Sequence, residues 1–237
     1  MDKRPTAALR QQLLLSVVEQ LKMPLISIAR SAELANLQSK PINLEIIRAT
    51  ADATLHLIDS YILGIQMAGQ ESELFAIEPV SVSSVLYDAG DQLQPMAKAY
   101  GVQLDLCIDG KYGPVMAHRL GLQAALVSLG YSLVEALPAM ETPKARLELS
   151  AYRCRYGIVT GLYCETEQVT TQALRLGRQL YGRARQPLGN MSHTSGAGVF
   201  VADAILQGMR SHLTVSRHRK MHGLGAVLPM NPQLQFI

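Results

Sequence analysis

Residues 44–65 have the sequence LEIIRATADATLHLIDSYILGI, in which the apolar positions fall three and four residues apart. This spacing is the heptad seam of a helix that packs along another helix. Gly69 follows the stretch and predicts the end of the helix. The seam residues are Leu44, Ile47, Ala51, Leu55, Ile58, Ile62 and Ile65.

The stretch before this seam predicts a second long helix. Its apolar residues keep the same spacing, and Pro24 inside it predicts a kink near Leu21, because proline removes one backbone donor. Residues 37–43 contain proline and asparagine and break the pattern, so the two helices form an antiparallel hairpin. The apolar positions of the first helix are Leu9, Leu13, Val17, Leu21, Leu25, Ile28, Ala32 and Ala35.

A two-helix hairpin cannot bury both of its apolar faces by itself. Pairing with a second copy would bury them in a four-helix bundle. We therefore expect a homodimer through residues 7–69. The alternative is an intramolecular partner from the second half of the chain.

The second half changes to a mixture of strands and helices. Residues 80–83 predict a short strand or the start of a helix, and several later stretches alternate apolar and polar residues as half-buried strands do. We expect a helical hairpin domain over residues 1–75 and an α/β sandwich over residues 76–237, which makes the fold class α+β. The sandwich should have a mixed sheet with helices on one face. The expected helices are 83–100, 120–137, 171–181 and 199–209, and the expected strands are 101–109, 145–152, 157–164, 212–216 and 225–229.

Composition excludes several classes of protein. The chain has 237 residues, of which 48% are hydrophobic and 17% charged, so a disordered chain is excluded. Its apolar runs are short and broken by polar residues, which argues against a membrane span, and the N-terminal residues lack the pattern of a signal peptide. The three cysteines are too few and too irregularly spaced for a disulfide framework or a zinc site. We therefore expect a cytoplasmic protein without a metal site.

The net charge of +3 is too small to demand a nucleic-acid partner. One basic cluster, at residues 217–220, predicts a solvated strand end or loop. The weaker reading of Arg217, Arg219 and Lys220 is a phosphate-binding patch in a nucleic-acid-associated regulator.

Six stretches, taken in chain order, resemble motifs of sensor histidine kinases. The first, Glu19-Gln-Leu-Lys-Met-Pro-Leu25, is similar to the family's phosphoacceptor motif H-E-L-R-T-P-L. The resemblance implies a dimerisation hairpin followed by a histidine kinase ATPase domain. The other five stretches are 54–69 (second hairpin helix), 78–86 (start of the ATPase domain), 118–132 (asparagine-bearing helix), 194–205 (glycine motif) and 223–229 (last strand).

The chain departs from the family where phosphate is accepted. The family uses a histidine there, whereas this chain has Glu19 in that slot. A carboxylate attacks phosphorus in other enzymes, but we expect Glu19 to be a charged residue on an exposed helix face. His56 in the second helix is the alternative acceptor.

The nucleotide contacts implied by the resemblance are also altered. The family's metal-binding asparagine corresponds to Ser132, whose hydroxyl is a weaker donor for Mg²⁺. Its adenine-binding aspartate corresponds to Cys164, or to Glu165 if the register shifts by one. Gly196 and Gly198 keep a glycine motif that lets backbone N–H groups approach phosphates. Residues 166–193 correspond to the family's lid, in which Arg183 and Arg185 are candidate phosphate contacts.

These departures predict a histidine kinase-like pseudokinase. It would act as a dimeric docking protein for a response regulator or a related partner, with no catalytic residue and no cofactor. The alternative is a phosphotransferase or phosphatase of a two-component pathway that binds ATP and Mg²⁺ through altered contacts.

Overall fold

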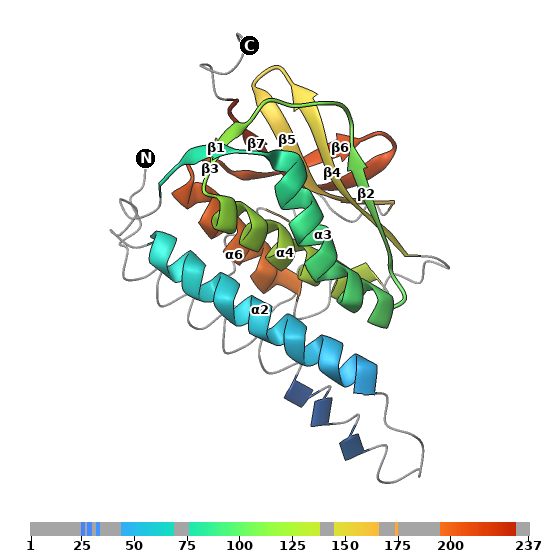
Figure 1. The fold of residues 1–237 in the computed structure, drawn as a ribbon. Helices are drawn as coiled ribbons and strands as arrows, with labels where there is room; N and C mark the ends of the chain where they lie inside the picture. The colour runs from blue at the N-terminus through green and yellow to red at the C-terminus, as the bar shows by residue number, and fades with distance from the viewer. Residues whose placement is uncertain are drawn as a thin grey trace.

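The computed structural model describes residues 25–26, 28–29, 32–33, 44–68, 76–137, 145–165, 174 and 195–230. These residues form a helix that precedes an α/β unit of strands and helices (Figure 1). The elements are α2 (Leu44–Ala68), β1 (Glu78–Val80), α3 (Val82–Ala99), β2 (Gln103–Ile108), β3 (Val115–Ala117), α4 (Arg119–Ala136), β4 (Arg146–Cys154), β5 (Gly157–Cys164), α6 (Ser195–Gly208), β6 (Leu213–His218) and β7 (Met221–Leu228).

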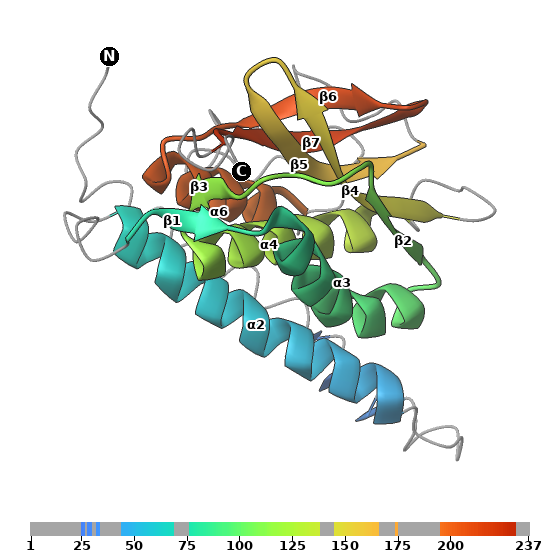
Figure 2. The same cartoon turned by 45° about the horizontal axis from the view of Figure 1, so that its top comes forward.

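The main sheet has five strands in the order β2-β4-β5-β7-β6. Strands β2 and β4 run parallel, and the other neighbours run antiparallel. Helices α3, α4 and α6 cover one face of the sheet, and α2 lies on the outer side of that helix layer (Figures 1 and 2). The predicted mixed sheet with helices on one face is therefore confirmed.

Residues 80–83 contain both structures that the sequence left open. Strand β1 ends at Val80, and Ser81 then caps α3 by accepting a hydrogen bond from the backbone N–H of Ser84. Strand β1 pairs antiparallel with β3, a three-residue strand that the alternation pattern was too short to predict. His118 caps the next helix, because its Nδ1 accepts from the N–H of Gly121 at 3.0 Å.

The core lies between the sheet and the helix layer. Helix α4 contacts α6, α3 and the sheet on its inner sides and α2 on its outer side, so apolar residues occur on all of its sides. Tyr131 of α4 is fully buried, and burial together with the nearby Asp52 carboxylate of α2 raises its pKa. The largest fully buried aliphatic side chains are Leu86, Leu93, Leu122, Leu129, Leu133, Leu147, Leu149 and Ile158.

Helix α2 packs on the α/β unit through a face that the heptad pattern did not indicate. Its buried residues are small or polar, among them Thr50 and Thr54, and Gly64 lies against Val201 and Ile205 of α6. The Thr54 hydroxyl donates to the Thr50 carbonyl at 2.6 Å, which satisfies it inside the helix. The intramolecular partner that the sequence left as an alternative therefore exists.

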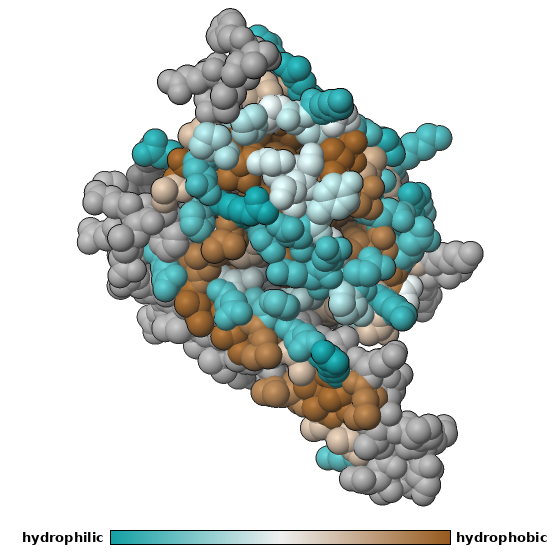
Figure 3. Space-filling view, viewed as in Figure 1, coloured by the Kyte–Doolittle hydropathy of each residue, from teal (hydrophilic) through white to brown (hydrophobic). Residues whose placement is uncertain are grey.

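Three residues of the predicted seam of α2 are exposed, and Ile47, Ala51 and Ile58 are half-buried. Leu44, Leu55 and Ile62 are 69%, 59% and 48% exposed. Figure 3 shows apolar surface along α2. Helical residues are described only in part within 25–33, so the hairpin, the kink at Pro24 and the helix end at Gly69 lie outside the described residues. The predicted helix 171–181 also lies outside them, apart from the helical and buried Leu174.

The sheet curls toward the side that faces away from the helices, so its two outer strands, β2 and β6, approach each other. Arg219, which follows β6, donates to Asp109, which follows β2, at 2.6 Å. In a flat five-stranded sheet the two outer strands would lie roughly 19 Å apart, since neighbouring strands are about 4.8 Å apart. The ring of Tyr163 fits inside the curl because Gly223 has no side chain; a Cβ there would lie 2.7 Å from the Tyr163 ring.

Substitution by alanine should change the free energy of unfolding in opposite directions at two helical glycines. A Cβ at Gly130 of α4 would lie 2.4 Å from a methyl of Leu93, whereas at Gly90 of α3 the nearest atom is 4.0 Å away. We expect Gly130→Ala to lower the free energy of unfolding by about 1–3 kcal/mol through overpacking. Gly90→Ala should raise it by about 0.5–1 kcal/mol through helix propensity. Urea denaturation measures both.

A double mutant separates overpacking from other causes. Adding Leu93→Ala to Gly130→Ala should cost less than the sum of the two single changes, because the clash disappears with the leucine methyls. Strict additivity would contradict the assigned contact.

Candidate functional site

Helices α4 and α6 are in van der Waals contact at Ser132 and Gly198, the two residues that the sequence resemblance assigned to a nucleotide pocket. A Cβ at Gly198 would lie 2.2 Å from the Ser132 hydroxyl oxygen and 2.3 Å from the Ser128 carbonyl oxygen. Only glycine fits at this crossing. The structure therefore brings Ser132 and Gly198 together, but against each other and not around an open space.

The hydroxyls of Ser128 and Ser132 are buried at this crossing and make no hydrogen bond to any residue that the structure describes. The adjacent cavity, between α4, α6 and the sheet, has a volume of about 10 Å³. A cavity needs about 10–15 Å³ to hold one water molecule, and small-molecule sites occupy about 300–1,000 Å³. The cavity is lined by Leu122, Ala125, Leu126, Leu129, Thr160, Ala202, Leu206, Leu213 and Ala226.

The two candidates for the adenine-binding slot lie in different environments. Cys164 ends β5, belongs to the buried core, and has its Sγ 3.6 Å from the carbonyl oxygen of His222. Glu165 follows directly and is exposed. An acidic side chain therefore does not occupy the buried position at the end of β5.

The remaining predicted site residues are placed only in part. Gly196 lies in the first turn of α6. Glu19, Arg183 and Arg185 lie outside the described residues.

His56, the alternative acceptor, borders a groove of about 360 Å³ between α2, α3 and α4. The lining is mixed, with Gln92 and Gln123 beside the exposed Leu120. His56 itself is half-buried, so it is neither fully solvated nor enclosed. The groove is the larger of the two cavities described in this part of the chain.

The basic cluster at residues 217–220 forms the end of β6 and the turn to β7, as the sequence predicted. It is only partly solvated, however. His218 is 8% exposed, and its ring stacks on Tyr152 with the centroids 4.3 Å apart. Arg219 is paired with Asp109, so the cluster is not a uniform positive patch.

One group of candidate metal ligands was missed from the sequence. Cys107, Glu148 and His218 come from three strands and meet inside the curl of the sheet. Burial, followed by the Glu148 carboxylate, raises the pKa of the Cys107 thiol. The alternation of residues 101–109 and 145–152 predicted the two strands that carry Cys107 and Glu148, but no sequence pattern brought these residues and His218 together.

Neither a protein-family model nor a curated protein matches the sequence. Solved structures do match. The chain is similar to the Acinetobacter baumannii histidine kinase AdeS, with 13% identity and a TM-score of 0.53 over 89% of this chain and 97% of that one. The chain has the fold of a histidine kinase catalytic domain.

Two further structures share this fold. Full-length ShkA in complex with AMPPNP is 13% identical, with a TM-score of 0.56 over 93% of this chain; the match spans 46% of ShkA, less than half of its length. A bacterial phosphotransferase is 9% identical, with a TM-score of 0.52 over 95% of this chain and 98% of that one. In the described part of the chain, no helix is both long and apolar enough to cross a membrane.

The close crossing of α4 and α6 can be tested by stability. Ser132→Ala should raise the free energy of unfolding by about 1 kcal/mol, because it removes a buried hydroxyl that has no partner. Gly198→Ala should lower it by about 2–4 kcal/mol, since the Ser128 carbonyl cannot move aside. Combining the two changes should recover only part of the loss. A neutral Gly198→Ala in urea denaturation would contradict the crossing.

Proposed function

We propose that this protein is a histidine kinase-like pseudokinase that acts as a dimeric docking protein in a two-component pathway. The observation that carries the proposal is the contact of Gly198 with Ser132. In the kinases that the sequence resembles, the corresponding residues hold the metal and the phosphates. Here the helix backbone at Gly198 takes up the space in front of the Ser132 hydroxyl.

The chemistry at these positions supports the same conclusion. A serine hydroxyl is a poorer ligand for a hard cation than an amide carbonyl, and this one is 2% exposed. The buried position at the end of β5 carries a thiol, Cys164, which cannot replace a carboxylate as acceptor from an adenine amine. Both positions therefore favour packing over nucleotide contacts.

The exposed seam of α2 supports the dimer. Leu44, Leu55 and Ile62 share one side of the helix, while the opposite side packs on α4 and α6. An apolar heptad seam left in water is unfavourable, and a second hairpin would bury it in a four-helix bundle. The partner through residues 7–69 is then a second copy of this chain, and a response regulator would dock on the bundle.

One comparison favours a second candidate function. The match to a bacterial phosphotransferase spans 95% of this chain and 98% of that one. A phosphotransferase or phosphatase acting on a receiver domain would need no ATP pocket in this chain. A shortened lifetime of the phosphoaspartate on a receiver, in the presence of this protein, would favour that function over docking alone.

Calorimetric titration with ATP and Mg²⁺ tests the pseudokinase. We expect no saturable heat, because the metal position is closed by Gly198. The variant Ser132→Asn restores the amide that the kinases use, and it should still not bind, since the larger side chain has no room at the crossing. Its folding is checked by circular dichroism. Saturable binding by the unchanged protein would contradict the proposal.

Charged substitutions on the seam test the dimer. Leu55→Glu and Ile62→Glu each bury a charge in the proposed interface, so they should shift sedimentation equilibrium from dimer to monomer. The matched control is Tyr87→Glu, which changes an apolar side chain of α3 that is 59% exposed and lies off the seam. A monomeric unchanged protein at micromolar concentration, or a control that dissociates equally, would overturn the proposed interface.

A further inference from the structure

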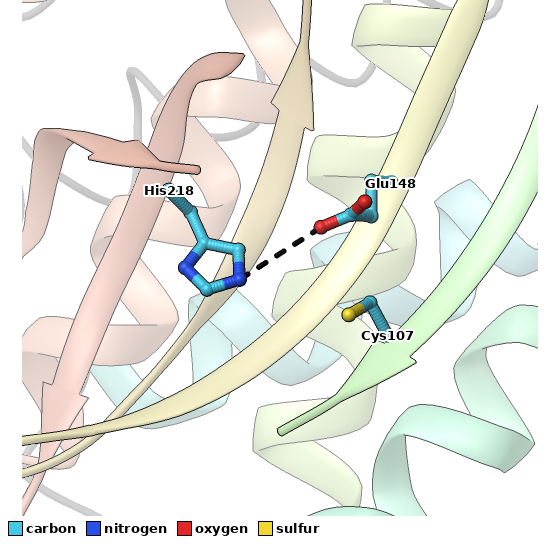
Figure 4. Close-up of side chains that lie close together, drawn as sticks. All are labelled: Cys107, Glu148 and His218. Carbon is cyan, nitrogen blue, oxygen red and sulfur yellow. Dashed lines mark ion pairs between the residues drawn. The ribbon is translucent and has the colours of Figure 1, made fainter. Parts of the chain in front are cut away.

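Three potential metal ligands from distant parts of the chain point toward one another on the curled face of the sheet (Figure 4). They are Cys107 of β2, Glu148 of β4 and His218 of β6. Their ligand atoms all lie within 4.8 Å of one another. The cluster is on the face of the sheet away from α3, α4 and α6, so it is separate from the degenerate nucleotide pocket.

The cluster contains buried polar atoms whose bonding capacity is not used. Glu148 is 2% exposed, and its Oε1 makes no hydrogen bond to any described residue. The Nε2 of His218 makes none either within the described chain, and its contacts are the ion pairs with Asp109 and Glu148. The ion-pair contact of Glu148 in the described part of the chain is with His218 at 4.0 Å. A buried carboxylate so weakly paired is destabilising unless a cation joins it.

Asp109, which follows β2, lies at the mouth of the cluster and is a candidate fourth ligand. Its Oδ2 lies 3.1 Å from the Nε2 of His218. Its Oδ1 lies 3.5 Å from the Sγ of Cys107. Bonds of about 2.0–2.3 Å in a tetrahedral zinc site put the ligand atoms about 3.3–3.8 Å apart. The separations of 3.1, 3.5 and 4.0 Å are close to these edges.

We propose that Cys107, Asp109, Glu148 and His218 form a binding site for Zn²⁺. Sulfur, imidazole and carboxylate ligands together in a four-ligand site fit Zn²⁺ better than Mg²⁺ or Ca²⁺, which take oxygen ligands. On binding, the Cys107 thiol loses its proton to solvent and the thiolate coordinates the metal. Two carboxylates, a thiolate and Zn²⁺ leave one negative charge, which Arg219 offsets through its hydrogen bond to Asp109.

The site would join the sheet across its curl. Its ligands belong to β4 and to the two outer strands, β2 and β6, which share no backbone hydrogen bonds with each other. Metal binding would therefore stabilise the curled form of the sheet independently of any partner or nucleotide. Cys107, Glu148 and His218 lie far apart in the sequence, in β2, β4 and β6, so the site exists only in the folded protein.

Cobalt substitution of the full chain tests the site directly. We expect one Co²⁺ per chain, with the intense visible bands of a tetrahedral site and a near-ultraviolet thiolate-to-cobalt charge-transfer band. Cys107→Ser should abolish the charge-transfer band, and the matched control Cys154→Ser should keep it. His218→Gln should weaken Zn²⁺ competition by more than about tenfold, whereas the exposed control His212→Gln should not. Absence of the band, or its persistence in Cys107→Ser, would overturn the proposal.

Thermal unfolding of the same variants gives a second readout. Zn²⁺ should raise the melting temperature of the unchanged protein. Glu148→Gln should raise the melting temperature of the metal-free protein, because it removes a buried and weakly paired charge, and should abolish the Zn²⁺-dependent rise. An unchanged Zn²⁺-dependent rise in Glu148→Gln would show that the metal binds elsewhere and would overturn the site.

Discussion

The approach of α4 to α6 at Gly198 determines how the rest of the molecule is arranged. Helix α4 lies between the sheet and α2 (Figure 2), and its distance from α6 sets the lateral spacing of the helices that cover the sheet. The crossing is closer than any residue with a Cβ would allow. Two serine hydroxyls are left unpaired there, which means that packing, not hydrogen bonding, holds the helices together. In the proposed pseudokinase, the same contact leaves no space for a phosphate group beside Ser132.

Much of the fold could be predicted because the alternating pattern of strands and the three-to-four spacing of helices are visible in the sequence. The alternation of residues 145–152 and the apolar run 157–164 gave two strands of the central sheet, and 80–83 gave the junction of β1 and α3. Strand β3 was missed because three residues carry no period. The packing face of α2 could not be predicted, since its buried residues Thr50, Thr54 and Gly64 are not apolar, and Gly64 is buried because it lies close to α6.

The candidate sites differ in how much of each could be predicted from the sequence. Ser132, Cys164 and Gly198 were found because they occupy positions in ordered motifs, but their mutual contact depends on the spacing of two helices. The cluster of Cys107, Glu148 and His218 could not be predicted from the sequence, because it depends on the curl of the sheet. Curl comes from many small twists and from glycines such as Gly223, which let a tyrosine ring lie against the backbone.

The hydrogen bond between Arg219 and Asp109, called the clasp below, should form late in folding. It joins residues 110 positions apart, and closing so long a loop is entropically costly compared with forming the β4–β5 and β6–β7 hairpins. The hairpins should therefore form early and the clasp last. In the native protein the clasp is then where the sheet opens first, so amide exchange near Asp109 and Arg219 reports local opening before the core of β5 is exposed.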